Sequence, residues 1–208
     1  MQIKIENLTK TIKGNDILSN INLSLESGNI YGFVGRNGSG KTMLLRAISG
    51  LIVPTEGTVS VDNCVLHKDI AFPANIGILI GNPEFLGYMS GLKNLLLLAE
   101  IKKQITKEKI ADFMKFFDLD PKSKKWVSKY SQGMKQKLGI IQAIMENPDL
   151  LILDESFNAL DESSVDKLRS LLLQYKEQGK LIIITSHNKE DIDMLCDEVF
   201  EMVDGRIK

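Results

Sequence analysis

One stretch of this sequence constrains its fold more than any other. Residues 35–42 read Gly-Arg-Asn-Gly-Ser-Gly-Lys-Thr and match the pattern GxxxxGK[ST]. They follow a short apolar run, residues 30–34, and lead into residues 41–49, where leucine and isoleucine recur at helical spacing. Such a match arises by chance in roughly 1% of chains of this length. The strand–loop–helix context therefore predicts a phosphate-binding loop rather than an ordinary glycine-rich turn.

Each residue type in this loop has a physical role in phosphate binding. Glycine lets successive backbone N–H groups turn toward phosphate oxygens, and the N-terminus of the following helix favours negative charge. We expect Lys41 to bridge the β- and γ-phosphates of a nucleotide and Thr42 to place its hydroxyl on Mg²⁺. The other loop residues expected to contact the nucleotide are Gly35, Asn37, Gly38, Ser39 and Gly40.

Polar residues also follow two apolar runs later in the chain. Residues 150–153, Leu-Leu-Ile-Leu, lead into Asp154 and Glu155, and residues 181–184 lead toward His187. Because side chains alternate along a strand, we expect Asp154 to bind Mg²⁺ through water and Glu155 to polarise the water that attacks the γ-phosphate. Ligands bind outside the carboxyl ends of strands in an open α/β sheet, so one pocket is expected to hold all these groups.

The spacing of apolar residues predicts an α/β fold. Spaced apolar positions within residues 3–8 and 21–25 predict antiparallel strands near the N-terminus. The wholly apolar runs 150–153 and 181–184 are typical of parallel strands that are buried on both faces. Between them, residues 165–175 carry apolar side chains at helical spacing and predict a crossover helix.

Residues 84–130 show a different pattern, with helical periodicity and many lysines. Residues 110–117 carry one apolar helix face. The lysines include Lys102, Lys103, Lys107 and Lys109. We interpret them as a solvated helix face rather than a nucleic-acid patch, because the net charge of −1 creates no field that favours nucleic acid. No nucleic-acid partner is therefore expected.

The apolar runs and the cysteines bear on three further classes, which are membrane-spanning proteins, secreted proteins and proteins stabilised by disulfides or zinc. No run approaches the ~18 consecutive apolar residues of a membrane span, and the first residues lack the apolar segment of a secretory signal. The two cysteines, Cys64 and Cys196, lie far apart and have no CxxC companion. We therefore expect both to be reduced, buried packing residues rather than disulfide or zinc partners.

Residues 130–137, Tyr-Ser-Gln-Gly-Met-Lys-Gln-Lys, resemble the signature loop of ABC transporter ATPases. Residues 158–161 resemble the D-loop of that family, and His187 matches its switch histidine. The resemblance spans nearly the whole chain. It implies an ATP-binding subunit in which two such domains sit head to tail, each signature loop closing over ATP held by the partner's phosphate loop.

The resemblance also implies roles for particular residues. Ser131, Gly133 and Asp161 are expected to contact nucleotide, Ser131 through its hydroxyl and Gly133 through a backbone N–H at the start of a helix. His187 is expected to contact the γ-phosphate and to act with Glu155 in catalysis. The implied cofactors are ATP and Mg²⁺.

The architecture that this resemblance implies is a P-loop NTPase core with a mostly parallel sheet, an N-terminal antiparallel β subdomain and an inserted α-helical subdomain. We expect one ATPase domain over residues 1–208. Residues 1–83 would form the β subdomain and the phosphate-loop part of the core, residues 84–130 the helical subdomain, and residues 131–208 the signature helix with the rest of the core.

Several positions depart from the common family pattern. Gln132 and Met134 replace the usual glycine and glutamine of the signature, a form that resembles bacterial exporters of antimicrobial peptides and lantibiotic immunity systems. Gly81 stands where a metal-binding glutamine is usual, and Asn82 or Glu84 are candidates to replace it. The other departures are the absence of an adenine-stacking aromatic near Ile12 and Ser156 in place of the usual proline.

The sequence thus predicts an ATP hydrolase that drives a separate transmembrane permease and has a second ATPase subunit as its dimer partner. We expect the direction of transport to be export. We expect it to be cytoplasmic and peripheral to the inner face of the membrane. The alternatives are a nonhydrolysing nucleotide-gated regulatory or sensing module and an ABC-type ATPase acting on ribosomes or DNA. A small-molecule kinase would leave the signature and D-loop segments unexplained.

Overall fold

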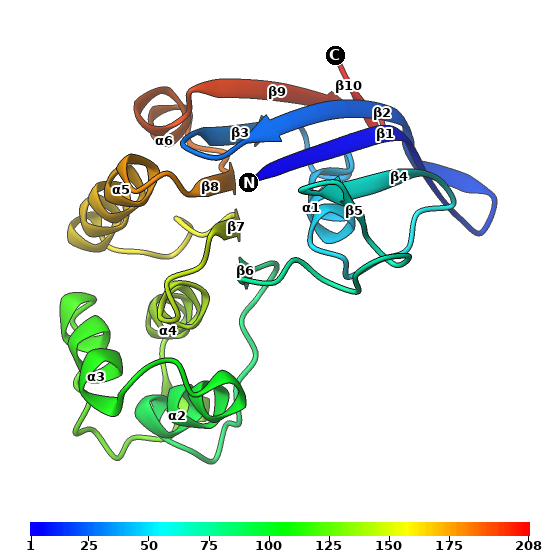
Figure 1. Cartoon of the computed structure of the whole chain (residues 1–208). Helices are drawn as coiled ribbons and strands as arrows, with labels where there is room; N and C mark the ends of the chain where they lie inside the picture. The colour runs from blue at the N-terminus through cyan, green and yellow to red at the C-terminus, as the bar shows by residue number, and fades with distance from the viewer.

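The computed structural model describes all residues 1–208 and contains two β-sheets (Figure 1). An antiparallel sheet of four strands has the order β2-β1-β4-β5. Its strands are β1 (Gln2–Ile12), β2 (Asn15–Glu26), β4 (Glu56–Val61) and β5 (Cys64–Val65). The N-terminal antiparallel sheet expected from the sequence is therefore confirmed.

The β1–β2 hairpin shows why the N-terminal sequence forms strands. Ile3 and Ile5 alternate with exposed residues, pair with Leu25 and Leu23 of β2, and are buried. The two residues between the strands, Lys13 and Gly14, both have positive φ, which matches the twist that a two-residue hairpin loop requires.

The second sheet has six strands in the order β10-β9-β3-β8-β7-β6. Its strands are β3 (Ile30–Val34), β6 (Ile76–Leu79), β7 (Leu150–Asp154), β8 (Leu181–Thr185), β9 (Glu198–Val203) and β10 (Arg206–Ile207). All neighbours pair in parallel except β9 and β10, which form an antiparallel hairpin at the end of the chain. Parallel pairing brings the segments after β3, β7 and β8 to the same edge of this sheet.

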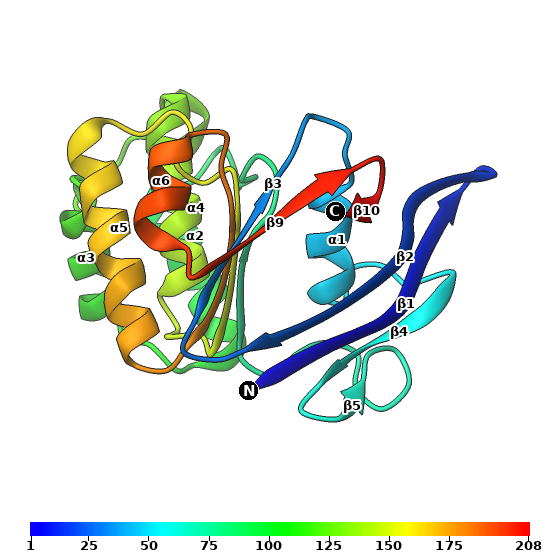
Figure 2. The same cartoon turned by 90° about the horizontal axis from the view of Figure 1, so that it is seen from above.

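Helices cover both faces of the six-stranded sheet (Figure 2). They are α1 (Lys41–Ile48), α2 (Gly91–Lys102), α3 (Lys107–Phe116), α4 (Gln132–Ile144), α5 (Glu162–Glu177) and α6 (Lys189–Leu195), with a short 3-10 turn at Val127–Lys129. Helix α1 lies between the two sheets, whereas α4, α5 and α6 cover the opposite face.

In β7, Leu150 and Ile152 pack on the α1 side while Leu151 and Leu153 pack on the other side. Burial on both faces explains the wholly apolar sequence of the strand.

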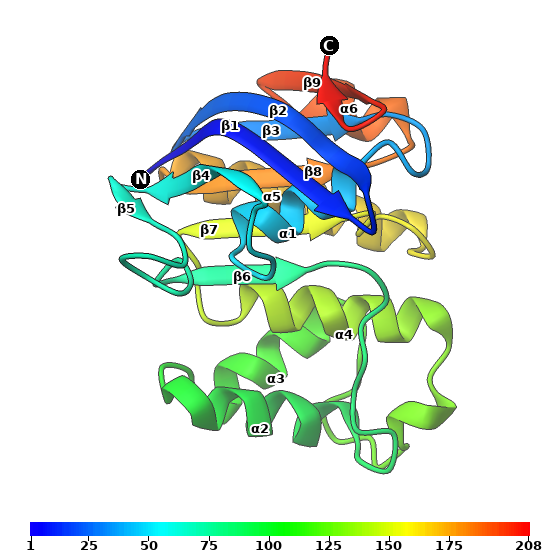
Figure 3. The ribbon, with the colours of Figure 1, turned by 90° about the vertical axis from the view of Figure 1, so that its right-hand side faces the viewer.

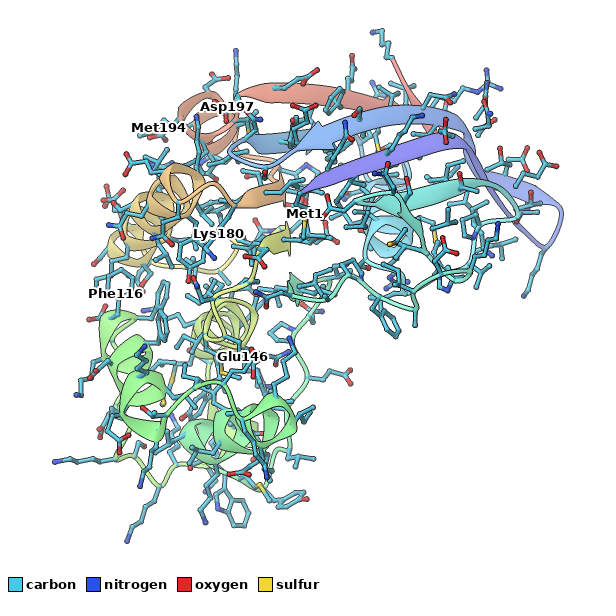
Figure 4. All side chains as sticks on the ribbon, viewed as in Figure 1. Met1, Phe116, Glu146, Lys180, Met194 and Asp197 are labelled. Atoms are coloured by element: carbon cyan, nitrogen blue, oxygen red, sulfur yellow. The ribbon has the colours of Figure 1, made fainter.

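The segment between β6 and β7 forms the helical insertion (Figure 3). Helices α2 and α3 pack beneath α4, with Ile110, Met114 and Phe117 buried. Phe116, at the end of α3, faces α5 (Figure 4), and Lys167 Nζ of α5 lies 6.0 Å from the centre of its ring. The lysines at 102, 103, 107 and 109 are exposed, as the sequence predicts for a solvated face.

The structure corrects the expectation that both cysteines are buried. Both are free thiols, but Cys64 is exposed at the start of the short edge strand β5. Its neighbour Val65 is the partly buried residue there, because alternate residues of a strand point to opposite faces. Cys196 is partly buried, and this burial raises the pKa of its thiol to about 12.

None of the helices has the length and apolar character that crossing a membrane requires.

Candidate active site

A cavity of about 410 Å³ lies at the carboxyl edge of the six-stranded sheet. It is lined by residues 37–43, by Ile17, and by Asp154, Glu155 and His187. The structure therefore brings together the three strand ends that the sequence analysis placed in one pocket. A larger hollow of about 890 Å³ lies between α3 and α5, but no residue of the phosphate loop lines it.

The backbone of the phosphate loop is closely packed and curved. Gly35 has φ +148°, and a Cβ atom there would lie 2.4 Å from the carbonyl oxygen of Met202. Gly40, at the N-terminus of α1, has φ +105° and would carry its Cβ 3.0 Å from the carbonyl oxygen of Ile17. Glycine is required at both positions for steric and conformational reasons.

Two side chains of the loop fit an anionic ligand. Ser39 Oγ is buried and has no hydrogen-bond partner within the protein, which is unusual for a hydroxyl. Lys41, the first residue of α1, is 7% exposed, and its ammonium donates to the carbonyl oxygens of Gly35 at 2.7 Å and Arg36 at 3.2 Å. A buried cation and an unpaired hydroxyl beside a helix N-terminus suit the phosphates of ATP.

Asp154 is held between two threonine hydroxyls. Thr42 Oγ1 donates to Asp154 Oδ2 and Thr185 Oγ1 donates to Asp154 Oδ1, each at 2.7 Å. Thr185 Oγ1 also accepts a hydrogen bond from the backbone N–H of Glu155 at 2.9 Å. Thr185 is not among the predicted site residues, and no local signal in the sequence reveals that it contacts both acidic residues. The hydroxyl and carboxylate oxygens that meet here are ligands that Mg²⁺ prefers.

Glu155 leaves the strand in a different direction from Asp154. Its φ of +52° is uncommon for a residue other than glycine. Glu155 Oε1 lies 3.1 Å from His187 Nε2, and Asn158 Nδ2 donates to Glu155 Oε2 at 3.3 Å. The side chains of Glu155 and His187 are 24% and 48% exposed, although Glu155 Oε1 itself is buried. Asp154 is instead 5% exposed, so the two neighbouring carboxylates have different environments.

Three predicted nucleotide contacts lie outside this cavity. Ser131 caps the N-terminus of α4, where its Oγ accepts from the backbone N–H of Met134 at 3.2 Å. A Cβ atom at Gly133 would lie 2.6 Å from the carbonyl oxygen of Ala159. Asp161 caps α5 through the backbone N–H of Ser164, at 3.0 Å. None of Ser131, Gly133 and Asp161 lines the cavity of the phosphate loop.

The signature and D-loop segments are also joined by side chains. Asp161 Oδ2 lies 2.6 Å from Lys137 Nζ of α4. Hydrogen bonding to this lysine lowers the pKa of Asp161 well below its ordinary value. Gln136 Nε2 donates to the carbonyl oxygen of Ser156 at 3.0 Å, a contact that sequence reasoning missed. Helix α4 is therefore tied to the segment that follows Glu155.

Two positions that depart from the family pattern lie away from the cavity. Gly81 is exposed, has φ +72°, and has open space where a Cβ atom would stand. Ile12 does not line the cavity, whose apolar wall includes Ile17 and Met43 instead.

The fold and the site define a P-loop ATPase of the transport-cassette class. The family model for ABC transporters matches residues 18–158. The ABC transporter ATP-binding protein YybJ of Bacillus subtilis (strain 168) is 50% identical over 206 residues, which cover 99% of this chain and 94% of YybJ. The bacitracin transport ATP-binding protein BcrA of Enterococcus faecalis is 36% identical over 99% of this chain and 67% of BcrA.

Solved structures agree with this class. A dimeric bacterial ABC transporter cassette, MJ0796, superposes with a TM-score of 0.89 at 25% identity, over 99% of this chain and 96% of the cassette. The chain belongs to the ABC transporter family, as an ATP-binding subunit with ATP hydrolase activity. The family membership that the sequence resemblance implied is thereby confirmed.

Proposed function

We propose that two copies of this chain close head to tail around two Mg²⁺–ATP complexes and hydrolyse them. The observation that carries this proposal is the division of the predicted site. The phosphate loop, Asp154, Glu155 and His187 share one cavity, whereas Ser131 and Gly133 lie outside it. A signature segment that does not line the cavity of its own chain is available for the nucleotide of a partner.

Within each site, the residues of this chain would act on ATP as follows. The loop N–H groups and Lys41 bind the phosphates, and Glu155 accepts a proton from the water that attacks the γ-phosphorus. His187 contacts the γ-phosphate and orients Glu155. Thr42 and Asp154 would hold Mg²⁺, which neutralises phosphate charge in the transition state.

Ser131→Arg tests whether the site is shared between chains. We expect steady-state ATP hydrolysis to fall at least ~10-fold because the arginine blocks the approach of the partner's nucleotide. ATP affinity of the single chain should change less than about 2-fold, since Ser131 does not line its own cavity. Hydrolysis rates and calorimetric titration measure the two effects. Ser170→Arg, on the exposed surface of α5, is the matched control, and an unchanged rate for Ser131→Arg contradicts the shared site.

The output of this ATPase is motion of a separate transmembrane permease, which places the chain at the inner face of the membrane. We further propose that residues 1–208 act as one domain, with residues 84–130 as a helical subdomain beside a core formed by residues 1–83 and 131–208. The exposed Leu86, Tyr88 and Trp126 of the helical subdomain offer apolar surface for the permease.

We also propose that the transporter exports a peptide antibiotic. Support comes from the signature form with Gln132 and Met134 and from the similarity to the bacitracin transport protein BcrA. Bacteria expressing this chain together with its permease, the membrane protein that it drives, should tolerate at least ~10-fold more bacitracin, since hydrolysis-driven export lowers the concentration at the target. Growth inhibition measures the effect. The membrane protein with a Glu155→Gln chain is the control, and equal tolerance in both strains contradicts active export.

A further inference from the structure

A buried charged cluster lies beneath the loop that carries His187. Its centre is Asp191 of α6, a carboxylate that is 1% exposed. Arg169 of α5 donates to Asp191 Oδ1 through Nε at 3.0 Å and through its terminal nitrogen at 2.6 Å. Ser186 Oγ donates to Asp191 Oδ2 at 3.0 Å. Both oxygens of this buried carboxylate are therefore bound, one by a cation and one by the residue that precedes His187.

Ser186 connects the cluster to both sides of His187. While its hydroxyl donates to Asp191, it accepts a hydrogen bond from the backbone N–H of Asn188 at 3.0 Å. The same serine oxygen thus ties together the residues before and after His187. The imidazole itself is nearly half exposed, and its polar contact is with Glu155. The position of the ring consequently depends on how firmly its two neighbours are held.

The helices that supply the cluster are fixed to one another at a second point. Helices α5 and α6 lie side by side (Figure 2). Lys176, near the end of α5, pairs with Asp197 just beyond α6. Asp197 Oδ2 also accepts from the backbone N–H of Ile30 in β3 at 2.8 Å. With α6 anchored at its far end, a movement of Asp191 relative to Arg169 is restricted.

We propose that Arg169, Asp191 and Ser186 are positioning residues that hold His187 against Glu155 for ATP hydrolysis. The proposal rests on the role of His187 in the proposed function. A buried ion pair is a weak source of net stability, but it fixes geometry here because Asp191, which is 1% exposed, would be an unpaired buried charge without Arg169. Arg169 also belongs to the helix that Asp161 caps, so α5 joins the D-loop segment to the histidine loop.

Asp191→Asn tests this positioning role with a variant of nearly equal volume. We expect kcat to fall about 10- to 100-fold, since small displacements of reacting groups have effects of that size. The KM and the calorimetric affinity for ATP should stay within about 2-fold, because Asp191 lies outside the phosphate loop. Ser186→Ala leaves the Arg169–Asp191 pair intact and should lower kcat at least about 5-fold. This second variant decides the question if Asp191→Asn does not fold, as judged by its melting temperature.

The matched control is Asp166→Asn. Asp166 also lies near Arg169, at 3.7 Å, but its side chain is 68% exposed and has no contact with the histidine loop. The kcat of the Asp166→Asn variant should equal that of the unmodified chain. Equal rates for Asp191→Asn, Ser186→Ala and the control would overturn the positioning role.

A double-mutant cycle with His187→Ala separates this inference from the function on which it rests. His187→Ala should lower kcat about 100-fold, and adding Asp191→Asn should lower it less than about 2-fold further, because both changes remove the same contact. If Asp191→Asn lowered kcat as much in the His187→Ala chain as it does alone, the proposal would be overturned, since Asp191 would then act independently of the histidine. An unchanged rate for His187→Ala alone would instead refute the proposed role of His187.

Discussion

Lys41→Ala is expected to weaken ATP binding at least ~100-fold and to reduce hydrolysis to background, because a charge-assisted contact with two phosphates is lost from a buried position. Lys41 is 7% exposed, and its ammonium is held by the carbonyl oxygens of Gly35 and Arg36. Calorimetric titration with Mg²⁺–ATP measures the affinity. An affinity equal to that of the unmodified chain would show that the phosphates bind elsewhere.

Two further variants separate charge from packing in this experiment. Lys41→Met keeps the aliphatic stem of the side chain but removes the ammonium, so it should lose ATP binding as completely as Lys41→Ala. Lys68→Ala removes an exposed lysine outside the site and should bind ATP normally. Recovery of binding in Lys41→Met would mean that the alanine variant fails through loss of packing rather than loss of charge.

Glu155→Gln is expected to lower steady-state hydrolysis at least ~100-fold while ATP affinity changes less than about 3-fold, since only the proton acceptor is removed. Glutamine has nearly the same shape as glutamate and retains an oxygen that can accept from Asn158, as Glu155 Oε2 does. ATP that binds but is not hydrolysed should keep two chains together. The variant should therefore elute as a dimer with ATP and as a monomer without it in size-exclusion chromatography with light scattering.

Glu177→Gln provides the control for this prediction. Glu177 ends α5, is exposed, and does not line the cavity. This variant should hydrolyse ATP at the rate of the unmodified chain. Substantial hydrolysis by Glu155→Gln would show that another group accepts the proton, because the amide of glutamine is not a useful base at neutral pH.

Local patterns predicted much of the fold and of the site. The wholly apolar runs at 150–153 and 181–184 predicted parallel strands, and both are central strands of the core sheet. The pattern at 35–42 predicted a loop between strand and helix, which the structure has between β3 and α1. These predictions succeeded because burial on both strand faces, and the φ angles that only glycine adopts readily, restrict which residues a short segment can contain.

Tertiary structure decided what no short segment encodes. Thr185 meets Asp154 across 31 positions of sequence, and Arg169 meets Asp191 across 22. The left-handed backbone of Glu155 and the exposure of Cys64 were likewise invisible in the sequence pattern. The sequence by itself determined which residues could bind phosphate and form buried strands, since those properties depend on residue type and local backbone geometry. Strand pairing and helix packing determined which distant side chains meet, because the pairing of β7 with β8 brings Thr185 to Asp154 and the packing of α5 against α6 brings Arg169 to Asp191.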